Sequence, residues 1–239
     1  MKEKVLIIIP AYNEEENIEK TYKSIMEYNK KNKTNYDVIV INDGSCDRTG
    51  EKLSKNSIPN INLIQNLGIG GAVQTGYKYA CINNYDIAVQ FDGDGQHDVN
   101  YISEIIKPII NKSANMVIGS RFITPELKGF KSSAARRCGI KIISSIIKFL
   151  TGIKVYDPTS GFRAVDKDII KLFSENYPTE YPEPVSEVSV LKQKYVIDEV
   201  AVVMHCRAGG KSSINAWKNV YYMINVTLAM FIESVKRFK

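Results

Sequence analysis

The amino-acid sequence predicts an α/β fold: a doubly wound, mostly parallel sheet flanked by helices, followed by a C-terminal helical appendage. Short apolar runs rich in β-branched residues alternate with longer helical segments between residues 5 and 121, at the spacing of βαβ units. Polar, often acidic loops follow several of these runs directly. The chain has 239 residues, which is enough for one such domain with a sizeable core.

The first half of the chain carries the regular part of this pattern. Strands are expected at 5–9, 38–41, 61–64, 87–91 and 115–118. Helices are expected at 14–28, after the loop 42–49, at 68–82 and at 99–110, and Asn13 is placed to cap the first of them. Because parallel strands end at the same edge of a sheet, the loops that follow them should face one crevice.

The alternation stops after residue 121. The sequence then predicts a basic loop at 129–137, an apolar helix at 140–150, a turn at 157–164, a helix from residue 185 and a strand at 199–204. Pro182 and Pro184 are expected to hold Glu183 on a stiff loop. The segment 216–239 is aromatic-rich and helical, and we expect it in the core or on a homodimer surface.

The composition limits the class of partner. The net charge of +6 favours an anionic substrate or a membrane surface, while the lack of a dense Lys/Arg tract argues against nucleic acid. The four cysteines are scattered without a CxxC pair, so we expect no zinc site, no disulfide framework and a cytoplasmic location. Neither a signal-peptide core nor a bilayer-spanning run is expected. Arg136 and Arg137 border the apolar helix at 140–150, which indicates peripheral contact with the inner face of the membrane as a second interpretation.

Two carboxylates close the expected strand at 87–91. Asp92 and Asp94 are separated by one glycine, so their side chains fall on the same side of an extended or tightly turned backbone. They would repel each other unless a cation lay between them, and Mg²⁺ and Mn²⁺ prefer such oxygen ligands. Gly93 leaves room for a diphosphate to approach the backbone. A plain surface turn is the alternative, whereas the spacing of an EF-hand calcium loop is not met.

The glycine-rich segment 66–72 introduces the helix at 68–82. It lacks the last glycine of a dinucleotide-binding motif, because Val73 stands there, and it lacks the Lys-Ser/Thr pair of a P-loop. A tight turn with close helix packing is as good an interpretation as a ligand contact.

Eight motifs together resemble one family. The chain is similar to family 2 glycosyltransferases of the GT-A fold, and within them to the dolichyl- or polyprenyl-phosphate mannosyltransferase-like branch. The matching segments occur in family order: PAYNEE (10–15), NDGS (42–45), NLGIGGA (66–72), FDGDGQH (91–97), GSR (119–121), DPTSGFRA (157–164), YPEP (181–184) and RAGGKSS (207–213).

The resemblance implies a domain organisation and an activity. Residues 1–215 would form the GT-A domain, with 1–121 as its nucleotide-sugar-binding half and 122–215 as its acceptor-binding half, and 216–239 would form the C-terminal helix. The activity implied is a metal-dependent, inverting transfer of a sugar from a UDP- or GDP-linked donor. The acceptor would be a lipid phosphate (a polyprenyl phosphate) or a cell-surface glycan.

The resemblance also assigns roles residue by residue. Glu183 stands at the position of the catalytic base, and Asp94 is counted as catalytic as well. The metal, Mg²⁺ or Mn²⁺, would be held by Asp92, Asp94 and Gln96, whereas His97 is expected to be structural and His205 is a lesser candidate ligand. The nucleotide-sugar-binding positions are Pro10, Tyr12, Glu14, Asp43, Gly71, Asp92, Gly93, Arg121, Arg207 and Lys211.

Three departures from the family pattern keep another function open. Asn42 replaces an aspartate, Ile69 stands where lysine is frequent, and Val185 stands where a second acid is frequent. These departures motivate the alternative of a nucleotide-sugar-binding subunit or regulator without turnover of its own. A nucleotidyltransferase would share the nucleotide-binding domain and metal carboxylates, but the order of the motifs argues against it.

Overall fold

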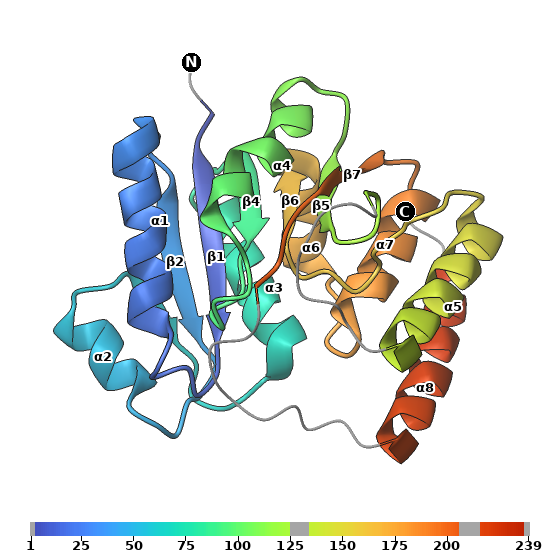
Figure 1. Ribbon diagram of the computed structural model, residues 1–239, viewed down its shortest axis with the longest axis horizontal. Coiled ribbons are helices and arrows are strands. Elements are labelled where there is room, and N and C mark those ends of the chain that lie inside the picture. The colour runs from blue at the N-terminus through green and yellow to red at the C-terminus, as the bar shows by residue number, and fades with distance from the viewer. Residues whose placement is uncertain (1–2, 125–133, 206–215, 237–239) are drawn as a thin grey trace.

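The computed structural model describes residues 3–124, 134–205 and 216–236, and in them a seven-stranded sheet (Figure 1). The strand order is β3-β2-β1-β4-β6-β5-β7. All neighbouring strands are parallel except where β6 pairs with β4 and β5, so the predicted mostly parallel α/β fold is confirmed. The strands are β1 (Val5–Ala11), β2 (Asp37–Asn42), β3 (Asn60–Asn62), β4 (Ile87–Gln90), β5 (Met116–Ser120), β6 (Arg163–Asp166) and β7 (Ile197–Ala201).

The helices cover both faces of the sheet and close two apolar cores. On one face α1, α2 and α4 pack against β1, β2 and β4, and on the other face α3, α5, α6, α7 and α8 form the larger core. The helices are α1 (Ile18–Asn32), α2 (Thr49–Lys55), α3 (Gly68–Ile82), α4 (Ile102–Ile110), α5 (Ala134–Thr151), α6 (Lys167–Glu175), α7 (Pro182–Lys192) and α8 (Ala216–Val235), with a 3₁₀ turn η1 (Val99–Tyr101) before α4.

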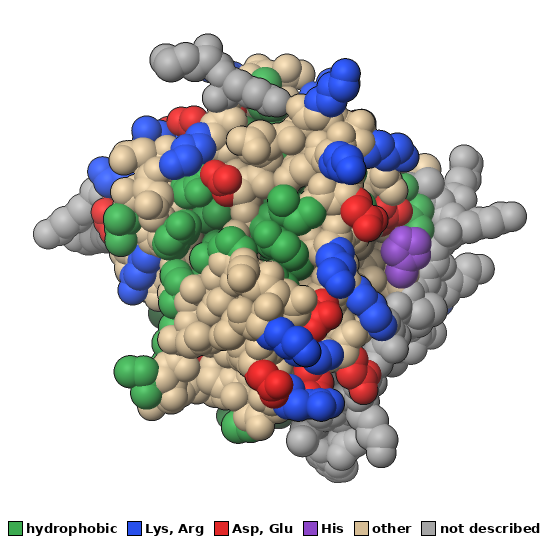
Figure 2. Space-filling view, turned by 90° about the vertical axis from the view of Figure 1, so that its left-hand side faces the viewer, with side chains coloured by type: hydrophobic (Ala, Val, Ile, Leu, Met, Phe, Trp, Pro, Cys, Tyr) green, Lys and Arg blue, Asp and Glu red, His purple; other side chains and the backbone are tan. Residues whose placement is uncertain are grey.

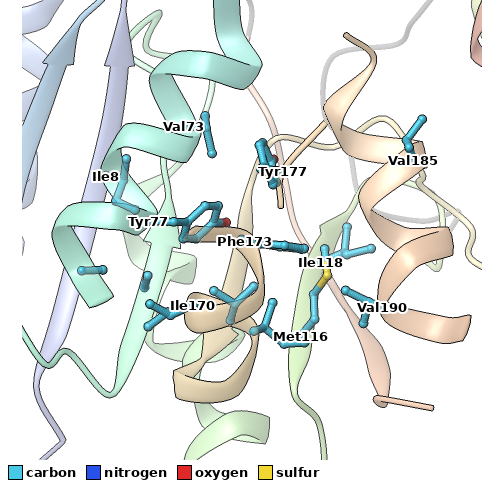
Figure 3. Close-up of a cluster of buried hydrophobic side chains, with 14 of the residues drawn as sticks. Ile8, Val73, Tyr77, Met116, Ile118, Ile170, Phe173, Tyr177, Val185 and Val190 are labelled. Carbon is cyan, nitrogen blue, oxygen red and sulfur yellow. The ribbon is translucent and has the colours of Figure 1, made fainter. Parts of the chain in front are cut away.

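The larger core is centred on three aromatic rings from α3, α6 and the segment after α6 (Figure 3). The ring centroids of Tyr77, Phe173 and Tyr177 lie 4.9 to 5.4 Å apart in tilted or edge-to-face contacts, the favoured geometry for aromatic pairs. This packing holds α3 and α6 together over β4.

Strand β6 was not expected, because the sequence predicts a turn over 157–164. It runs antiparallel between β4 and β5 and places Arg163 opposite Gln90. Its four residues include only two apolar ones, Ala164 and Val165, so the strand carries no pattern of its own and exists because two neighbouring strands supply its hydrogen bonds. Helix α6 was also missed; the Asp166 side chain caps it by accepting a 3.0 Å hydrogen bond from Ile169 N.

Two further predictions were wrong near the ends of helices. Glu183 lies in the first turn of α7 rather than on a stiff loop, because a proline at the start of a helix interrupts no intrahelical hydrogen bond. Asn13 does not cap α1, which begins at Ile18; it adopts a left-handed backbone with φ of 55°, and its side chain accepts a hydrogen bond from Cys46 N.

Other boundaries shift by a few residues. Residues 134–137 belong to α5 rather than to a basic loop, and 129–133 lie outside the described residues. Strands β3 and β7 begin one and two residues earlier than expected. The expected halves 1–121 and 122–215 share one sheet, because β6 lies between β4 and β5. None of the helices in the described part of the chain is long and apolar enough to cross a bilayer.

The surface on the α1 and α2 side carries mixed charge. Figure 2 shows hydrophobic side chains gathered near the middle of this face, surrounded by basic and acidic ones. At the amino-terminal ends of β1 and β2, a cleft of about 460 Å³ is lined by several tyrosines. The candidate site described below lies at the opposite ends of these strands.

Candidate active site

A cleft of about 570 Å³ opens at the carboxyl ends of β1, β2 and β4. It is the edge at which open α/β sheets bind ligands. Further walls come from the start of α3, the loop before β6 and the first turn of α7. Eight of the predicted site residues line it: Pro10, Tyr12, Glu14, Asp43, Asp92, Gly93, Asp94 and Glu183.

Asp43 joins the end of β2 to the glycine-rich turn. Its side chain is buried, and Oδ1 accepts a 2.7 Å hydrogen bond from Leu67 N. Asn66 Nδ2 donates to the Asp43 carbonyl, and Asn66 also lines the cleft. One carboxylate oxygen of Asp43 therefore anchors the start of α3, and no described residue donates a hydrogen bond to the other oxygen, Oδ2.

Replacing Asp43 with Asn tests whether Oδ1 anchors α3 while Oδ2 contacts a ligand in the cleft. Asn retains an oxygen for Leu67 N, so α3 should stay in place, but the second oxygen becomes an amide. We expect UDP affinity to fall about 10-fold with less than about 1 kcal/mol change in unfolding free energy. Asp37→Asn is the matched control: Asp37 lies at the other end of β2, where it accepts a hydrogen bond from Tyr85. Unchanged UDP affinity in Asp43→Asn would remove Asp43 from the site.

His97 contacts both the backbone and the carboxylate of Asp92. Its Nδ1 accepts a 3.1 Å hydrogen bond from Asp92 N, and its Nε2 lies 3.5 Å from Asp92 Oδ2. The imidazole is buried, with the rings of Phe91 and Phe162 at 5.2 and 4.9 Å between centroids. Burial lowers the pKa of His97 to about 4, opposed by the charge of Asp94. The ring is therefore neutral near pH 7, and a proton on Nε2 satisfies both contacts.

The loop before β6 presses against the same carboxylate. A Cβ atom on Gly161 would lie 2.7 Å from Asp92 Oδ2 and 3.1 Å from Gln90 Nε2. Only glycine leaves room here for the carboxylate in its present orientation. The sequence marked the segment 157–164 as a motif, but nothing in it indicated a contact with Asp92.

Glu183 reaches the cleft from the start of α7. Burial raises the pKa of Glu183 above its ordinary value, and the negative charge of Asp92 adds to the rise. The positive charge of Arg163 and a hydrogen bond from the Gln90 side chain act in the opposite direction. A carboxyl group with a raised pKa beside a polar cleft can serve as a general base.

The donor set suits a hard divalent cation better than zinc. Within the described residues no three His, Cys, Asp or Glu side chains converge as a metal-binding set. Asp92 and Asp94 both line the open cleft on one short loop, and Asp94 Oδ1 is oriented by a 3.1 Å hydrogen bond from Gln96 N. Mg²⁺ and Mn²⁺ are commonly held by one or two carboxylates and completed by substrate phosphates and water, so these residues fit such an ion.

Four other predicted residues, Gln96, His205, Arg121 and Gly71, are not among the described residues that line the cleft. Gln96 donates through Nε2 to the His205 carbonyl at 3.4 Å, and the His205 ring lies 3.4 Å from Asp98 Oδ2. Arg121 forms a two-pronged ion pair with Asp157, at 2.7 Å for both contacts. Gly71 is buried inside α3, and Arg207 and Lys211 lie outside the described residues.

Comparison with known proteins now identifies the family. Residues 6–173 match the model of glycosyl transferase family 2. The chain belongs to this family. It is therefore a glycosyltransferase, and its relatives place it in the branch of polyprenyl-phosphate sugar transferases.

Two named relatives illustrate this branch of the family. A UDP-N-acetylglucosamine–dolichyl-phosphate N-acetylglucosaminyltransferase of Methanococcus voltae is 37% identical over 218 residues, covering 83% of this chain and 84% of the relative. A dolichol-phosphate mannosyltransferase of Pyrococcus furiosus is 32% identical over 219 residues, covering 88% of this chain and 59% of the relative.

Solved structures show the same fold at low identity. Glucosyl-3-phosphoglycerate synthase of Mycobacterium tuberculosis, in complex with Mn²⁺, UDP-glucose and phosphoglyceric acid, superposes with a TM-score of 0.72. The identity is 16%, and the match covers 99% of this chain and 81% of that one. The GT-A architecture expected from the sequence is thereby confirmed.

Proposed function

We propose that this family 2 glycosyltransferase transfers a sugar from a UDP-linked donor to a polyprenyl phosphate, with a divalent metal and with inversion at the anomeric carbon. The observation that carries the proposal is the convergence of Asp43, the Asp92–Asp94 pair and Glu183 on one cleft. The relative at 37% identity, whose name specifies UDP-N-acetylglucosamine and dolichyl phosphate, supports this choice of donor and acceptor.

The residues of the cleft would divide the work. Tyr12 and Asp43 would hold the base and ribose, and Asp92 and Asp94 would hold Mg²⁺ or Mn²⁺. Bound there, the ion would stabilise the negative charge that develops on the departing diphosphate. An acceptor oxygen that attacks from the face opposite the diphosphate forms the new C–O bond as the old one breaks, which inverts the configuration. A phosphate oxygen is already anionic, so it needs little help from a base.

Calorimetry with UDP and GDP, with and without Mn²⁺, is the first experiment. Tight, Mn²⁺-dependent binding of UDP is expected, followed by transfer from UDP-N-acetylglucosamine to a polyprenyl phosphate. Binding of GDP alone would move the donor to the GDP-linked class. Binding without transfer to a lipid phosphate or a glycan acceptor would favour a regulatory subunit. If neither nucleotide bound, the proposed site would be wrong.

The pH profile of Glu183→Gln separates the two acceptor classes. If the acceptor is a hydroxyl, Glu183 must be deprotonated to act as base. Its raised pKa then places the acidic limb of kcat above the ordinary range of a glutamate, with the rate falling as pH falls through that value. Glu183→Gln should abolish the limb and lower kcat at least about 100-fold. With a phosphate acceptor, we expect Glu183→Gln to lower kcat less than about 10-fold.

An apolar face on α5 and α8 would bring such an enzyme to its lipid acceptor. Phe149 on α5 is 79% exposed, and Tyr221 and Val235 on α8 are 70% and 77% exposed. The Phe149 and Phe231 rings lie 6.5 Å apart, so the two helices present one continuous surface. Lys141, beside this surface, could pair with anionic headgroups. This arrangement supports peripheral contact with the inner face of the membrane.

Vesicle binding checks this placement. The protein should co-sediment with phosphatidylglycerol vesicles. Phe149→Glu should lower the bound fraction at least about 5-fold, because a charge replaces apolar side-chain area that would enter the membrane. Ile82→Glu is the matched control, since Ile82 is 78% exposed at the end of α3. If Phe149→Glu instead leaves vesicle binding unchanged and converts a dimer into a monomer in light scattering, the face is a homodimer surface.

A further inference from the structure

Two buried polar side chains to which no role has been assigned lie under the candidate site. Gln90 at the end of β4 and Arg163 at the start of β6 are directly opposite each other in the antiparallel register. Opposed residues on neighbouring strands project from the same face of the sheet. The two residues are 1% and 0% exposed, so both are enclosed by the elements above them.

Arg163 clamps two segments that carry parts of the site. Its guanidinium donates to the Ser160 carbonyl from Nε at 3.2 Å and from Nη2 at 2.8 Å. On the other side, Nη1 donates to Ser186 Oγ at 3.0 Å and to the Glu183 carbonyl at 3.5 Å, while Nη2 lies 3.2 Å from Glu187 Oε1. Ser160 precedes Gly161, which packs against the Asp92 carboxylate. The hydrogen bonds of Arg163 therefore connect the backbone of the loop that contacts Asp92 to the backbone of Glu183.

Gln90 acts on the side chains of the same two acids. Its Nε2 lies 3.4 Å from Asp92 Oδ1, and the Gln90 side chain is also among the groups that lower the pKa of Glu183. Its Oε1 is buried and makes no hydrogen bond to any described residue. An amide with one unsatisfied buried oxygen costs free energy. The contacts that offset this cost are those with Asp92 and Glu183, two acids that repel each other when both are ionised.

We propose that Gln90 and Arg163 form a positioning unit that holds Glu183 at a set separation from Asp92. Arg163 contacts the backbone carbonyl of Glu183, and Gln90, opposite it in the sheet, contacts the carboxylate of Asp92. The inference rests on the proposed function, because it assumes that Asp92 binds the metal and that Glu183 faces the reacting sugar. A purely structural role would lower stability without changing turnover by the folded enzyme.

Gln90→Met is the decisive variant, because methionine matches the length of glutamine and removes its hydrogen bonds. With UDP-N-acetylglucosamine and a polyprenyl phosphate in phosphatidylglycerol vesicles, we expect kcat to fall about 3- to 8-fold, which is no more than the loss expected for Glu183→Gln with that acceptor. The dissociation constant for UDP with Mn²⁺ should change less than about 3-fold. Arg163→Lys keeps the positive charge but loses the planar guanidinium that donates several hydrogen bonds at once. It should therefore lower kcat by a smaller factor than Gln90→Met does.

The matched control is Asn115→Leu. Asn115 also makes side-chain amide contacts between segments, but it is only partly buried and lies at the opposite end of the sheet, where it contacts Asp166 and Val196. It should lower the melting temperature and leave kcat within about 2-fold. An unchanged kcat in Gln90→Met, or a loss no larger than that of Asn115→Leu, would overturn the proposal.

A double-mutant cycle shows whether Gln90 works through Glu183. Adding Gln90→Met to Glu183→Ala should cost less than about 2-fold, because the positioned group is already gone. An equal loss in both backgrounds would overturn the proposal. If Glu183→Ala has no measurable turnover, a crystal structure of Gln90→Met must show the Glu183 carboxylate displaced, and an unmoved carboxylate would equally overturn it.

The failure of the proposed function would look different. Wild-type protein that neither binds UDP with Mn²⁺ nor transfers a sugar would refute that function before any variant is compared. Active wild type with an equally active Gln90→Met refutes the positioning unit alone.

Discussion

Asp92→Asn and Asp94→Asn are each expected to lower kcat about 1,000-fold or more and to abolish the Mn²⁺ dependence of UDP binding. Both carboxylates line the cleft at the end of β4, and among the described residues of its lining they are the only two acids on the same loop. Replacing one carboxylate with an amide removes an anionic ligand of the metal, so the metal would bind more weakly. The positive charge of the metal, which would stabilise the leaving diphosphate, is then lost from the site. The amide keeps the size of the side chain, so packing against Gly161 and His97 should survive.

Isothermal titration and initial rates over a range of Mn²⁺ concentrations would measure both effects. Asp86→Asn is the control, because Asp86 lies just before the other end of β4, where it accepts a hydrogen bond from Lys4 N. It should bind UDP as the wild type does. Full Mn²⁺-dependent activity in Asp92→Asn would show that the metal is held elsewhere.

Arg163→Met is expected to lower the free energy of unfolding by about 3–5 kcal/mol at pH 7. Arg163 and Glu187 are both fully buried, and the ion pair between them is 3.2 Å long. Burial already raises the pKa of Glu187 well above its ordinary value, and Arg163 is the principal group that opposes this rise. Without the arginine, a buried carboxyl group is left with no positive partner.

Urea denaturation at two pH values would test the cause. Arg163 lowers the pKa of Glu187 in the folded wild type, so removing Arg163 raises that pKa further; the loss then grows with the ionised fraction of Glu187 in the folded wild type, and this fraction shrinks as pH falls. The loss in Arg163→Met should therefore be smaller at pH 5 than at pH 7. Arg163→Met combined with Glu187→Met should recover at least half of it. A loss below about 1 kcal/mol, or one independent of pH, would contradict this account.

The strand ends and their polar loops could be predicted from the sequence because the signal is local. A continuous apolar run such as that of β1 can be buried only as a central strand, and Asp92 and Asp94 follow β4 within four residues. The parallel order then brings the carboxyl ends of β1, β2 and β4 together without further information. Seven of the eight predicted residues that line the cleft meet there for this reason, and the eighth, Glu183, comes from α7.

The neighbours of those residues were decided by the tertiary structure. Strand β6 has no period of its own, yet its antiparallel insertion puts Arg163 beside Gln90 and Gly161 against Asp92. His97 looked structural in the sequence, but its ring orients Asp92 because Phe91 and Phe162 enclose it. Local sequence determined where the chain turns and which acids lie at its turns. Contacts between residues 65 or more positions apart determined how those acids are held, because the packing around a buried side chain depends on which strands become neighbours.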